Sequence, residues 1–370
     1  METYSGCKPD IQLSEIMQRP ETTYDLKRIE HLIEGYVALG SFKIPIISRK
    51  MNLKDYLGSL MVRFGIHRVD YHFPPGLYLI GEQRDDLPVI VSCNYKLTLD
   101  ALRTSLKGTG YWLLILDTKG VNVWCAAGKG TFGTEELVFQ LTKWCIKELL
   151  KVKSVILPQL GASRMTPSIV QKLTGLKVEY GPVRAVDLDE FINNNHVASE
   201  ASRTVMFPWK ERLVLTPVEF MMSLRYLLPI YLFMIFWNYI NFGFVLEFAQ
   251  PMLQTMPWLL MMFTGAVLFP LTLPLLPTKP FSTKGMILGL PMVIIVFANS
   301  EWFALGSNLL QWLSWSMAYL LYVGYLALNF TGSTTFTCLS GVGYEVGHYK
   351  KMMMVGGAAS VGLMVLSFFL

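Results

Sequence analysis

The segment best suited to chemistry is Asn122-Val123-Trp124-Cys125-Ala126-Ala127-Gly128-Lys129-Gly130. Two alanines and a glycine follow Cys125, which would leave room beside the sulfur for a large, flat group. A thiol near the start of a helix is expected to ionise readily, because backbone N–H groups and a nearby lysine stabilise the thiolate. Spacing alone leaves two interpretations open, a seat for a cofactor and an ordinary tight turn.

The glycines of this segment do not form a phosphate loop. Residues 127–131 read Ala-Gly-Lys-Gly-Thr, but a P-loop requires glycine at position 123 and serine or threonine at position 130. The chain has Val123 and Gly130 at these positions. Nucleotide binding is therefore excluded as an interpretation of this segment.

The other thiols and the histidines offer no metal site. The five cysteines are Cys7, Cys93, Cys125, Cys145 and Cys338, without a CxxC pair. Such a set predicts a reducing compartment, no disulfide framework and no ferredoxin-type iron–sulfur cluster within this chain. Cys93 and Cys145 are predicted to be buried packing residues. The histidines also lack metal-ligand spacing, and we expect them to be ordinary surface or partly buried residues.

The elements around Cys125 predict an α/β fold. Strand-like runs at 87–94, 111–117, 153–158 and 177–180 alternate with helix-like runs at 98–107, 134–149, 163–173 and 187–194. This alternation predicts a mainly parallel sheet with helices on both faces, and ligands bind such sheets beyond the carboxyl ends of the strands. The Cys125 segment and the turns at Gly161 and Gly181 would lie at that edge. Thr134 is expected to cap the helix that follows.

The first 75 residues are predicted to form a helical extension. Residues 1–24 show no periodicity and are expected to be loosely ordered, whereas apolar residues in 26–37 recur at helical spacing. A clearer helix is predicted over 52–64, with Asn52 as its cap and Asp55 reaching back. Its apolar stripe comprises Leu53, Tyr56, Leu57, Leu60, Met61 and Phe64, bordered by Arg49, Lys50, Lys54 and Arg63. The stripe either lies on an anionic membrane surface or packs onto its own domain.

The C-terminal part is too apolar for a water-soluble domain. All but four of the 32 Lys and Arg and all but three of the 27 Asp and Glu fall in the first 225 residues. Five stretches approach the roughly 20 residues that a transmembrane helix needs. They lie at 222–244, 257–277, 285–303, 309–330 and 352–370. Tryptophans 237, 258, 302, 312 and 315 are expected towards the span ends, as an aromatic belt.

The basic residues outside these stretches predict the topology. Lysines and arginines all fall on one side, so the N-terminal domain is expected in the cytoplasm, at the inner membrane, with the C-terminus outside. Because no charged residue lies deep in a span, anchoring and assembly are favoured over transport. The predicted division is an extension at 1–75, an α/β domain at 76–208, a linker at 209–221 and a transmembrane domain at 222–370. No basic stripe interleaved with aromatic residues is present, so nucleic-acid binding is not expected.

The residues of 122–129 are similar to the cap-helix motif of the corrinoid protein of microbial mercury methylation (the HgcA family). The flanking runs that share this resemblance are Gly76 to Tyr78, Asn94 to Lys96, Leu116 to Gly120, Gly130 to Leu137, Leu157 to Ala162, Tyr180 to Ala185, Leu213 to Glu219 and Thr331 to Val342. The resemblance extends from about residue 50 onward and includes a membrane domain after the corrinoid domain.

What the resemblance implies is a Rossmann-like corrinoid-binding domain that relays a methyl group. A cobalamin-type corrinoid in its base-off form would be bound by residues 122–130 with Gly161 and Gly181. None of the histidines stands in the Asp-x-His-x-x-Gly pattern of one large class of cobalamin proteins, and Cys125 would instead be the lower axial ligand of cobalt and the catalytic residue. Asn122 and Trp124 would fix the cap helix, and Lys129 could bond a corrin side chain.

The same resemblance implies the partners. Cobalt would accept methyl from a methyl-tetrahydrofolate-dependent donor and pass it to Hg(II), forming methylmercury, with a ferredoxin-like iron–sulfur protein as reductant. The resemblance also implies the lipid bilayer as a partner and a possible homodimer.

Two alternatives stay open. The large subunits of corrinoid iron–sulfur proteins of the acetyl-CoA pathway share the fold and cap helix, but have a non-thiol residue where Cys125 stands and lack this membrane domain. In the first alternative, the chain is a membrane-tethered corrinoid methyl carrier of acetyl-CoA-type one-carbon metabolism. In the second, it is a non-catalytic corrinoid-binding membrane protein.

Overall fold

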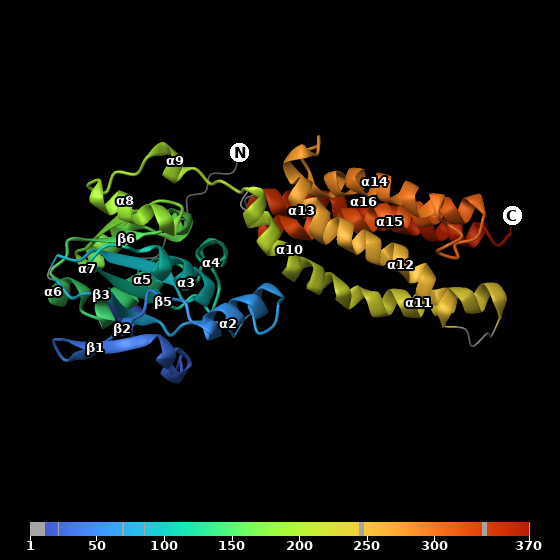
Figure 1. Ribbon diagram of the computed structural model, residues 1–370. Helices are drawn as coiled ribbons and strands as arrows, with labels where there is room; N and C mark the ends of the chain where they lie inside the picture. The colour runs from blue at the N-terminus through green and yellow to red at the C-terminus, as the bar shows by residue number, and fades with distance from the viewer. Residues whose placement is uncertain are drawn as a thin grey trace, which may run out of the picture. The chain divides into compact units, whose positions relative to one another are not determined.

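The computed structural model describes residues 12–20, 22–68, 70–84, 86–243, 248–334 and 339–369. The chain divides into two compact units (Figure 1). The first comprises Met1–Met61 and His67–Val205, and the second comprises Val62–Ile66 and Met206–Leu370. The first unit is α/β and the second is helical. Cys7 and Cys338 lie outside the described residues.

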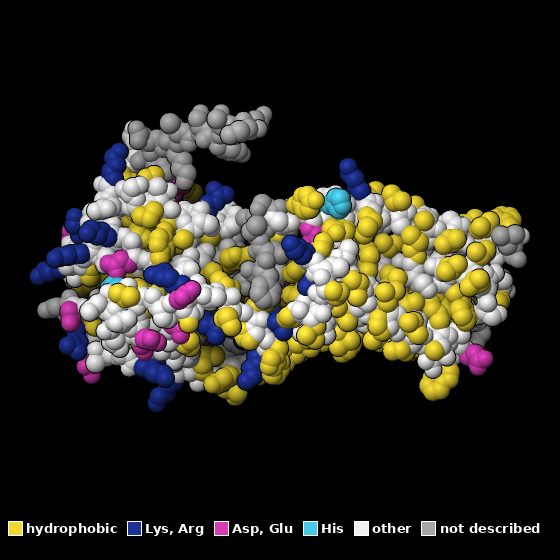
Figure 2. Space-filling model, turned by 90° about the horizontal axis from the view of Figure 1, so that it is seen from above, with side chains coloured by type: hydrophobic (Ala, Val, Ile, Leu, Met, Phe, Trp, Pro, Cys, Tyr) yellow, Lys and Arg dark blue, Asp and Glu magenta, His cyan; other side chains and the backbone are white. Residues whose placement is uncertain are grey.

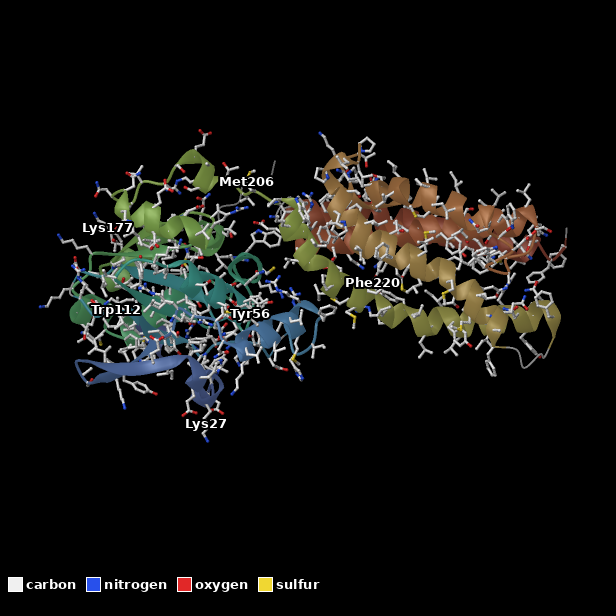
Figure 3. All side chains as sticks on the ribbon, viewed as in Figure 1. Lys27, Tyr56, Trp112, Lys177, Met206 and Phe220 are labelled. Atoms are coloured by element: carbon white, nitrogen blue, oxygen red, sulfur yellow. The ribbon has the colours of Figure 1, made fainter. Side chains whose placement is uncertain are left out.

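The first unit is built on a seven-stranded mixed sheet in the order β1-β2-β3-β5-β4-β6-β7. The predicted α/β class is confirmed, but only β5, β4, β6 and β7 form the expected parallel set, because β3 runs antiparallel to β5. Every residue of β5 is buried, so both faces of the sheet are covered at its centre. Trp112 of β5 lies within this core (Figure 3). The strands are β1 Ile33–Leu39, β2 Phe42–Ile47, β3 Gly76–Gly81, β4 Val89–Cys93, β5 Gly110–Leu116, β6 Ser154–Leu157 and β7 Lys177–Tyr180.

The N-terminal extension is not helical throughout. The 3-10 helix Leu26–Leu32 is followed by β1 and β2, which form a hairpin that joins the sheet through β3. The helix predicted from apolar residues in 26–37 is wrong for residues 33–37, which lie in β1. The side chains of β1 alternate between half-buried and exposed, as in a strand. Gly40 makes the turn with a φ of +57°, a conformation that glycine adopts without strain.

Residues 12–20 and 22–24 are also better ordered than predicted. The short helix α1, Leu13–Met17, packs against the helix α5, Thr134–Lys143. The guanidinium of Arg19 pairs with Glu136 and lies 4.0 Å from the ring centroid of Phe139. The hydroxyl of Tyr24 donates to Asp117 at 2.6 Å. The prediction of a loose N-terminus is therefore wrong for these residues, while residues 1–11 lie outside the described part.

The helices of the first unit differ from the predicted pattern over residues 133–149. The expected helix over 134–149 is two helices, because Cys145 takes a left-handed conformation with a φ of 45°. The cap before α5 is Gly133 and not Thr134, whose hydroxyl instead donates to the carbonyl of Arg164 and accepts from the amide of Thr166. The helices are α2 Leu53–Arg63, α3 Lys96–Ser105, α4 Val123–Lys129, α5 Thr134–Lys143, α6 Ile146–Leu150, α7 Pro167–Thr174, α8 Leu188–Asn193 and α9 Glu200–Arg203, with 3-10 turns η2 Gln159–Arg164 and η3 Ala185–Asp187.

The start of α2 follows its prediction. The amide of Asn52 donates to the carboxylate of Asp55, and the amide of Asp55 donates to the side-chain oxygen of Asn52 at 2.9 Å. This reciprocal pair satisfies two N–H groups that a helix start leaves free. The apolar stripe of the helix is exposed, so the reading in which it packs onto its own domain is wrong.

The second unit consists of long apolar helices. In the part of the chain that the structure describes, three continuous helical runs, Trp209–Phe242, Ala249–Leu275 and Phe281–Ala298, are long and apolar enough to cross a membrane. The predicted linker at 209–221 is thus helical, and for the stretches 309–330 and 352–370 a membrane span stays a prediction. Hydrophobic surface dominates this unit, whereas charged side chains are spread over the first (Figure 2). The helices are α10 Trp209–Ser223, α11 Leu227–Phe242, α12 Ala249–Phe263, α13 Phe269–Thr272, α14 Phe281–Ala298, α15 Leu309–Asn329 and α16 Leu339–Leu366.

Aromatic side chains form the interior of the second unit. Trp237 and Trp315 are buried and their rings meet edge to face, with centroids 5.9 Å apart. The prediction that these two tryptophans belong to an aromatic belt is therefore wrong, because they pack inside the bundle, whereas Trp302 is exposed. Helices α14 and α15 approach closely at Gly285, where an added Cβ would lie 2.5 Å from the Cβ of Ala327. Small residues at such crossings are typical of helix packing in membranes.

Candidate functional site

The short helix α4 positions Cys125. The side-chain oxygen of Asn122 accepts from the amide of Cys125 at 2.9 Å, which caps the helix start. The helix ends at Gly130, whose φ of +87° and N–H group close the last turn on the carbonyls of Ala126 and Ala127. Both ends of the helix are thus fixed by local hydrogen bonds.

The two faces of α4 have different surroundings. Val123, Ala126 and Ala127 are buried, so these small side chains pack inward and do not open space beside the sulfur. Cys125 is half-buried and shares the outward face with Gly128, one helical turn along. Trp124 is also half-buried, and Lys129 is exposed. The thiol therefore has Gly128 as its small neighbour on the accessible side.

Helix α4 lies at the carboxyl edge of the parallel strands. It follows β5 and packs against η2, which follows β6, so it lies at one end of these strands (Figure 1). The connections after β4 and β6 lead to opposite sides, to β5 and to β7, and this makes the edge between β4 and β6 the switch point of the sheet. Ligands of open α/β sheets bind at such switch points. The predicted edge location of the Cys125 segment is confirmed.

Asn94 holds the loop that leads into α4, a role that no sequence pattern predicted. It directly follows β4 and is fully buried. Its side-chain oxygen accepts from the amide and hydroxyl of Thr118, at 3.0 and 2.8 Å, and from the amide of Gly120 at 2.9 Å. Its amide group donates to Asp117 at 3.3 Å. A polar residue directly after a buried strand is the signal that would have indicated this position.

Gly161 and Gly181 lie at the predicted edge of the sheet, but buried side chains pack closely against both glycines. A Cβ at Gly161 would lie 2.4 Å from Cε1 of the buried Phe132. A Cβ at Gly181 would lie 3.0 Å from Cγ2 of Ile156. Close packing of the two turns explains both glycines, and their cofactor role stays a prediction.

The thiol of Cys125 is not acidified. Burial raises its pKa, and the charges of Lys129 and Arg68 with a hydrogen bond from Asn122 lower it by less. The predicted shift towards thiolate is therefore wrong in direction. The cap and the lysine have the expected influence, but desolvation of the half-buried sulfur outweighs them.

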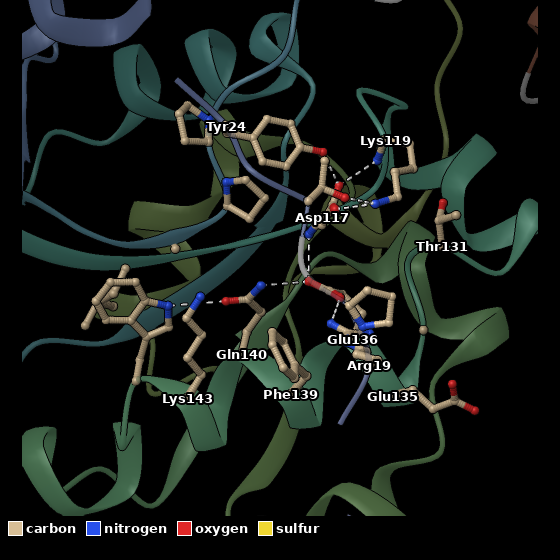
Figure 4. A pocket seen from close by; sticks show the side chains of 18 of the residues that line it. Arg19, Tyr24, Asp117, Lys119, Thr131, Glu135, Glu136, Phe139, Gln140 and Lys143 are labelled. Atoms are coloured by element: carbon tan, nitrogen blue, oxygen red, sulfur yellow. Dashed lines mark hydrogen bonds and ion pairs between the residues drawn. The ribbon is translucent and has the colours of Figure 1, made fainter. Parts of the chain in front are cut away.

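A pocket of about 800 Å³ opens beside α4 (Figure 4). Of the predicted site residues, only Gly130 lines it. Its walls combine the turn after α4, the loop after β5, the whole length of α5, the start of β3 and the N-terminal segment around Arg19 and Tyr24. The pocket thus adjoins the Cys125 segment without including the thiol.

Two polar clusters line this pocket. Glu136 is buried and accepts from the amide of Asp117 at 2.8 Å, from Gln140 at 2.9 Å and from Arg19. Burial raises the pKa of Glu136 despite these bonds. Asp117 also accepts from Tyr24 and Lys119, and although burial works in the opposite direction, these bonds lower its pKa. Figure 4 shows both clusters joined through Asp117.

The first unit matches a known family over most of its length. The family model "CO dehydrogenase/acetyl-CoA synthase delta subunit" matches residues 17–191. The gamma subunit of the acetyl-CoA decarbonylase/synthase complex of Archaeoglobus fulgidus is 26% identical over 155 residues, which are 40% of this chain and 33% of that protein. The same subunit of Methanocaldococcus jannaschii is 27% identical over 196 residues, 51% of this chain and 38% of that protein.

A third relative carries a cofactor in its name. The corrinoid/iron–sulfur protein large subunit of Moorella thermoacetica is 29% identical over 118 residues, which are 31% of this chain and 26% of that protein. The chain thus spans between about a quarter and two fifths of the length of these relatives. Their names refer to corrinoid and acetyl-CoA chemistry, so the resemblance to the mercury-methylation family stays a prediction. The matched residues, which include the sheet and α4, support a corrinoid-protein family for this part of the chain.

Proposed function

We propose that the chain is a membrane-associated corrinoid protein that carries a methyl group for one-carbon metabolism of the acetyl-CoA type. The observation that carries this proposal is the position of Cys125, on the outward face of α4 at the carboxyl edge of the sheet. This helix lies within residues 17–191, the part that matches the corrinoid-related family model. The apolar helices of the second unit support the membrane association.

The residues of α4 fit a corrinoid. A corrin ring needs close access to a backbone, and Gly128 offers it on the face that Cys125 shares. Sulfur is a soft donor suited to a transition metal, so the Cys125 thiol would hold the cobalt of a bound corrinoid. Asn122 holds the first turn, and the exposed Lys129 is available to the amide or phosphate groups of a corrinoid.

When bound, the corrinoid supplies a cobalt that takes up and gives up a methyl group. The chain's part is to orient a sulfur donor and to manage its proton. Since burial raises the pKa of the Cys125 thiol, ligation must release a proton to solvent. Lys129 and Arg68 favour the thiolate electrostatically and reduce that cost.

The finer candidate is that Hg(II) accepts the methyl group and methylmercury is formed. The observation that favours it is the Cys125 thiol itself, because a thiolate would be a strongly donating ligand for the cobalt of a bound corrinoid. A ferredoxin-like reductant and a methyl-tetrahydrofolate-dependent donor belong to this candidate. A homodimer and a cytoplasmic position of the first unit at the inner membrane are further parts of it.

A single spectrum tests the main proposal. The full chain is purified in detergent, reconstituted with cobalamin and freed of unbound cofactor. We expect the wild-type protein and Cys145→Ala to keep a base-off corrinoid spectrum, and Cys125→Ala to lose the cofactor or shift its bands. A colourless wild-type protein would overturn the proposal, and an unchanged Cys125→Ala spectrum would remove the ligand role.

The methyl acceptor needs a separate assay. Anaerobic cells carrying the chain are incubated with and without Hg(II), and methylmercury and other methylated products are measured. If Hg(II) is the acceptor, Cys125→Ala abolishes methylmercury formation, whereas Cys93→Ala and Cys145→Ala retain some. A methylated product that forms equally well without Hg(II) would favour the one-carbon carrier instead.

A further inference from the structure

Helix α2 presents an uncovered apolar face. Its five large apolar side chains at positions 53, 56, 57, 60 and 61 are between 42% and 73% exposed. At 3.6 residues per turn they occupy an arc of about 140° around the helix. Tyr56 marks this face in Figure 3. An apolar stripe of this width is what a helix uses to bury itself against something else.

The opposite face of α2 fixes how the helix is turned. The Asp55 carboxylate is buried and accepts from Lys96 at 2.8 Å and from Arg103 at 2.7 Å. Both cations also bond Asp100, and Arg103 is fully buried. Turning the apolar face inward would unpair these buried charges, which is strongly unfavourable. The apolar face therefore stays directed outward.

Basic side chains border the apolar face on both sides. On a helical wheel, Lys54 follows one border of the arc and Arg63 precedes the other, while the exposed Lys50 lies just before the helix. The only acid between positions 49 and 68 is Asp55, which is buried on the opposite face. The accessible surface is thus apolar in its centre and positive along its borders.

We propose that α2 lies in the plane of an anionic lipid bilayer, with its apolar face in the boundary between headgroups and acyl chains. Long basic side chains at the borders of such a helix reach the lipid phosphates while the apolar side chains are buried. A protein partner would need acidic groups opposite both borders, whereas an anionic membrane supplies them everywhere. The proposal does not depend on corrinoid chemistry.

The same chain provides a membrane anchor for α2. An isolated helix of 11 residues would bind lipid weakly, but the second unit contains helical runs that are long and apolar enough to cross a bilayer. Tethering turns the docking of α2 into an intramolecular event with a high effective concentration. The modest area of the apolar face is then sufficient for α2 to bind the bilayer.

Photo-crosslinking in the full chain tests the proposal. Leu60→p-benzoylphenylalanine is placed on the apolar face, and Glu148→p-benzoylphenylalanine, on the exposed side of α6, is the matched control. Both proteins are reconstituted in vesicles of phosphatidylglycerol and phosphatidylcholine, irradiated and analysed by mass spectrometry. We expect a lipid adduct at position 60 and none at position 148. Leu57→p-benzoylphenylalanine repeats the test if the first variant melts below the wild-type temperature.

Charge reversal tests the role of the basic borders. Lys54→Glu with Arg63→Glu, combined with the probe at position 60, should lower the yield of lipid adduct at least about fivefold, because each basic residue near the surface contributes about that factor. Lys147→Glu with Lys153→Glu, both remote from α2 in sequence, should leave it unchanged. Vesicles of phosphatidylcholine alone should give the low yield with the unreversed protein.

Three outcomes would overturn the proposal. They are a lipid yield at position 60 no higher than at position 148, crosslinks at position 60 to protein only, and a lipid yield that is indifferent both to charge reversal and to phosphatidylglycerol. Crosslinks to protein would identify the face as a protein interface.

Discussion

Asn94 is the residue on which the loop before α4 depends. Three hydrogen bonds to its side-chain oxygen fix Thr118 and Gly120, both of which are buried. The loop they hold connects β5 to the helix that carries Cys125. A change at Asn94 therefore acts on the candidate site through the backbone, without touching α4 itself.

We predict that Asn94→Ala loosens this loop and destabilises the first unit. Two buried N–H groups would lose their acceptor, which corresponds to about 3 kcal/mol in total. Hydrogen exchange of residues 117–121 should rise, and the melting temperature of the first unit should fall. Asn194→Ala is the matched control, because Asn194 donates a single exposed bond to the carbonyl of Val197. Equal effects of the two variants would contradict the role of Asn94.

The raised pKa of Cys125 has a kinetic consequence. Since the thiolate is the reactive form, alkylation of cofactor-free protein at Cys125 should be slower at neutral pH than that of a free cysteine, and should accelerate as the pH rises through the raised pKa. Lys129→Ala removes a charge that favours the thiolate, so it should slow the reaction further at a given pH. Iodoacetamide labelling across pH, followed by mass spectrometry of the Cys125 peptide, measures both effects. A rate faster than that of free cysteine would show that the thiol is acidified after all.

At the residue scale, local chemistry was predictable and burial was not. The sequence indicated that Cys125 begins a helix at the sheet edge, because cap residues and small residues are local signals. It could not indicate that Ala126 and Ala127 turn inward, or that desolvation exceeds the influence of Lys129 on the thiol. Both depend on burial by tertiary packing, and α4 packs against η2, which is distant in sequence.

At the element scale, the buried charges beneath α2 make the stability of the first unit depend on pH. Burial works to raise the pKa of Asp55, but Lys96, the amide of Asn52 and Arg103 overcome it and lower the pKa from about 3.8 to about 2. A carboxylate with a depressed pKa contributes stability that is fully present above its unfolded pKa. That contribution is lost as the pH falls from about 4 towards 2.

We predict that Asp55→Asn destabilises the first unit by about 3 kcal/mol, because it leaves the buried Arg103 and Lys96 short of one negative charge. The variant should also lose the part of the acid sensitivity that Asp55 provides. Thermal melting between pH 2 and pH 7 measures both. Asp86→Asn is the control, since Asp86 is exposed. A melting curve of Asp55→Asn that matches the control at pH 7 would contradict the charge network.

Elements with strong end signals were predictable, and elements defined by partners were not. The capping pair of Asn52 and Asp55 indicated the start of α2, whereas the apolar stripe left open whether that face points outward or packs onto its own domain. Residues 33–47 become strands because β1 pairs with β2 and β2 pairs with β3, and neither periodicity nor propensity contains these partners. The break at Cys145 likewise follows from a left-handed backbone conformation that no residue type there announces.

At the scale of the whole molecule, charge distribution separates the two units. Nearly all Lys and Arg fall within the first 225 residues, and hydrophobic surface dominates the second unit. Composition alone was enough to predict this division. Composition could not predict the strand order, because the position of β3 between β2 and β5 depends on pairing between distant segments.

We predict that the first unit lies on the cytoplasmic side of the membrane. Trypsin should degrade it in inverted inner-membrane vesicles and leave it intact in spheroplasts, because basic residues are retained on the cytoplasmic side. Cytoplasmic and periplasmic marker proteins control the orientation of each preparation. Cleavage in intact spheroplasts would reverse the proposed topology.

The side chain of Thr134 makes the corner after α4 a cooperative unit. Its hydroxyl joins the start of α5 to the segment before α7 through Arg164 and Thr166, so neither segment can open without breaking bonds of the other. Native proteins open in such linked groups, each with its own opening free energy. Residues 130–134 and 159–166 should therefore fluctuate together, and a motion that exposes one would expose both.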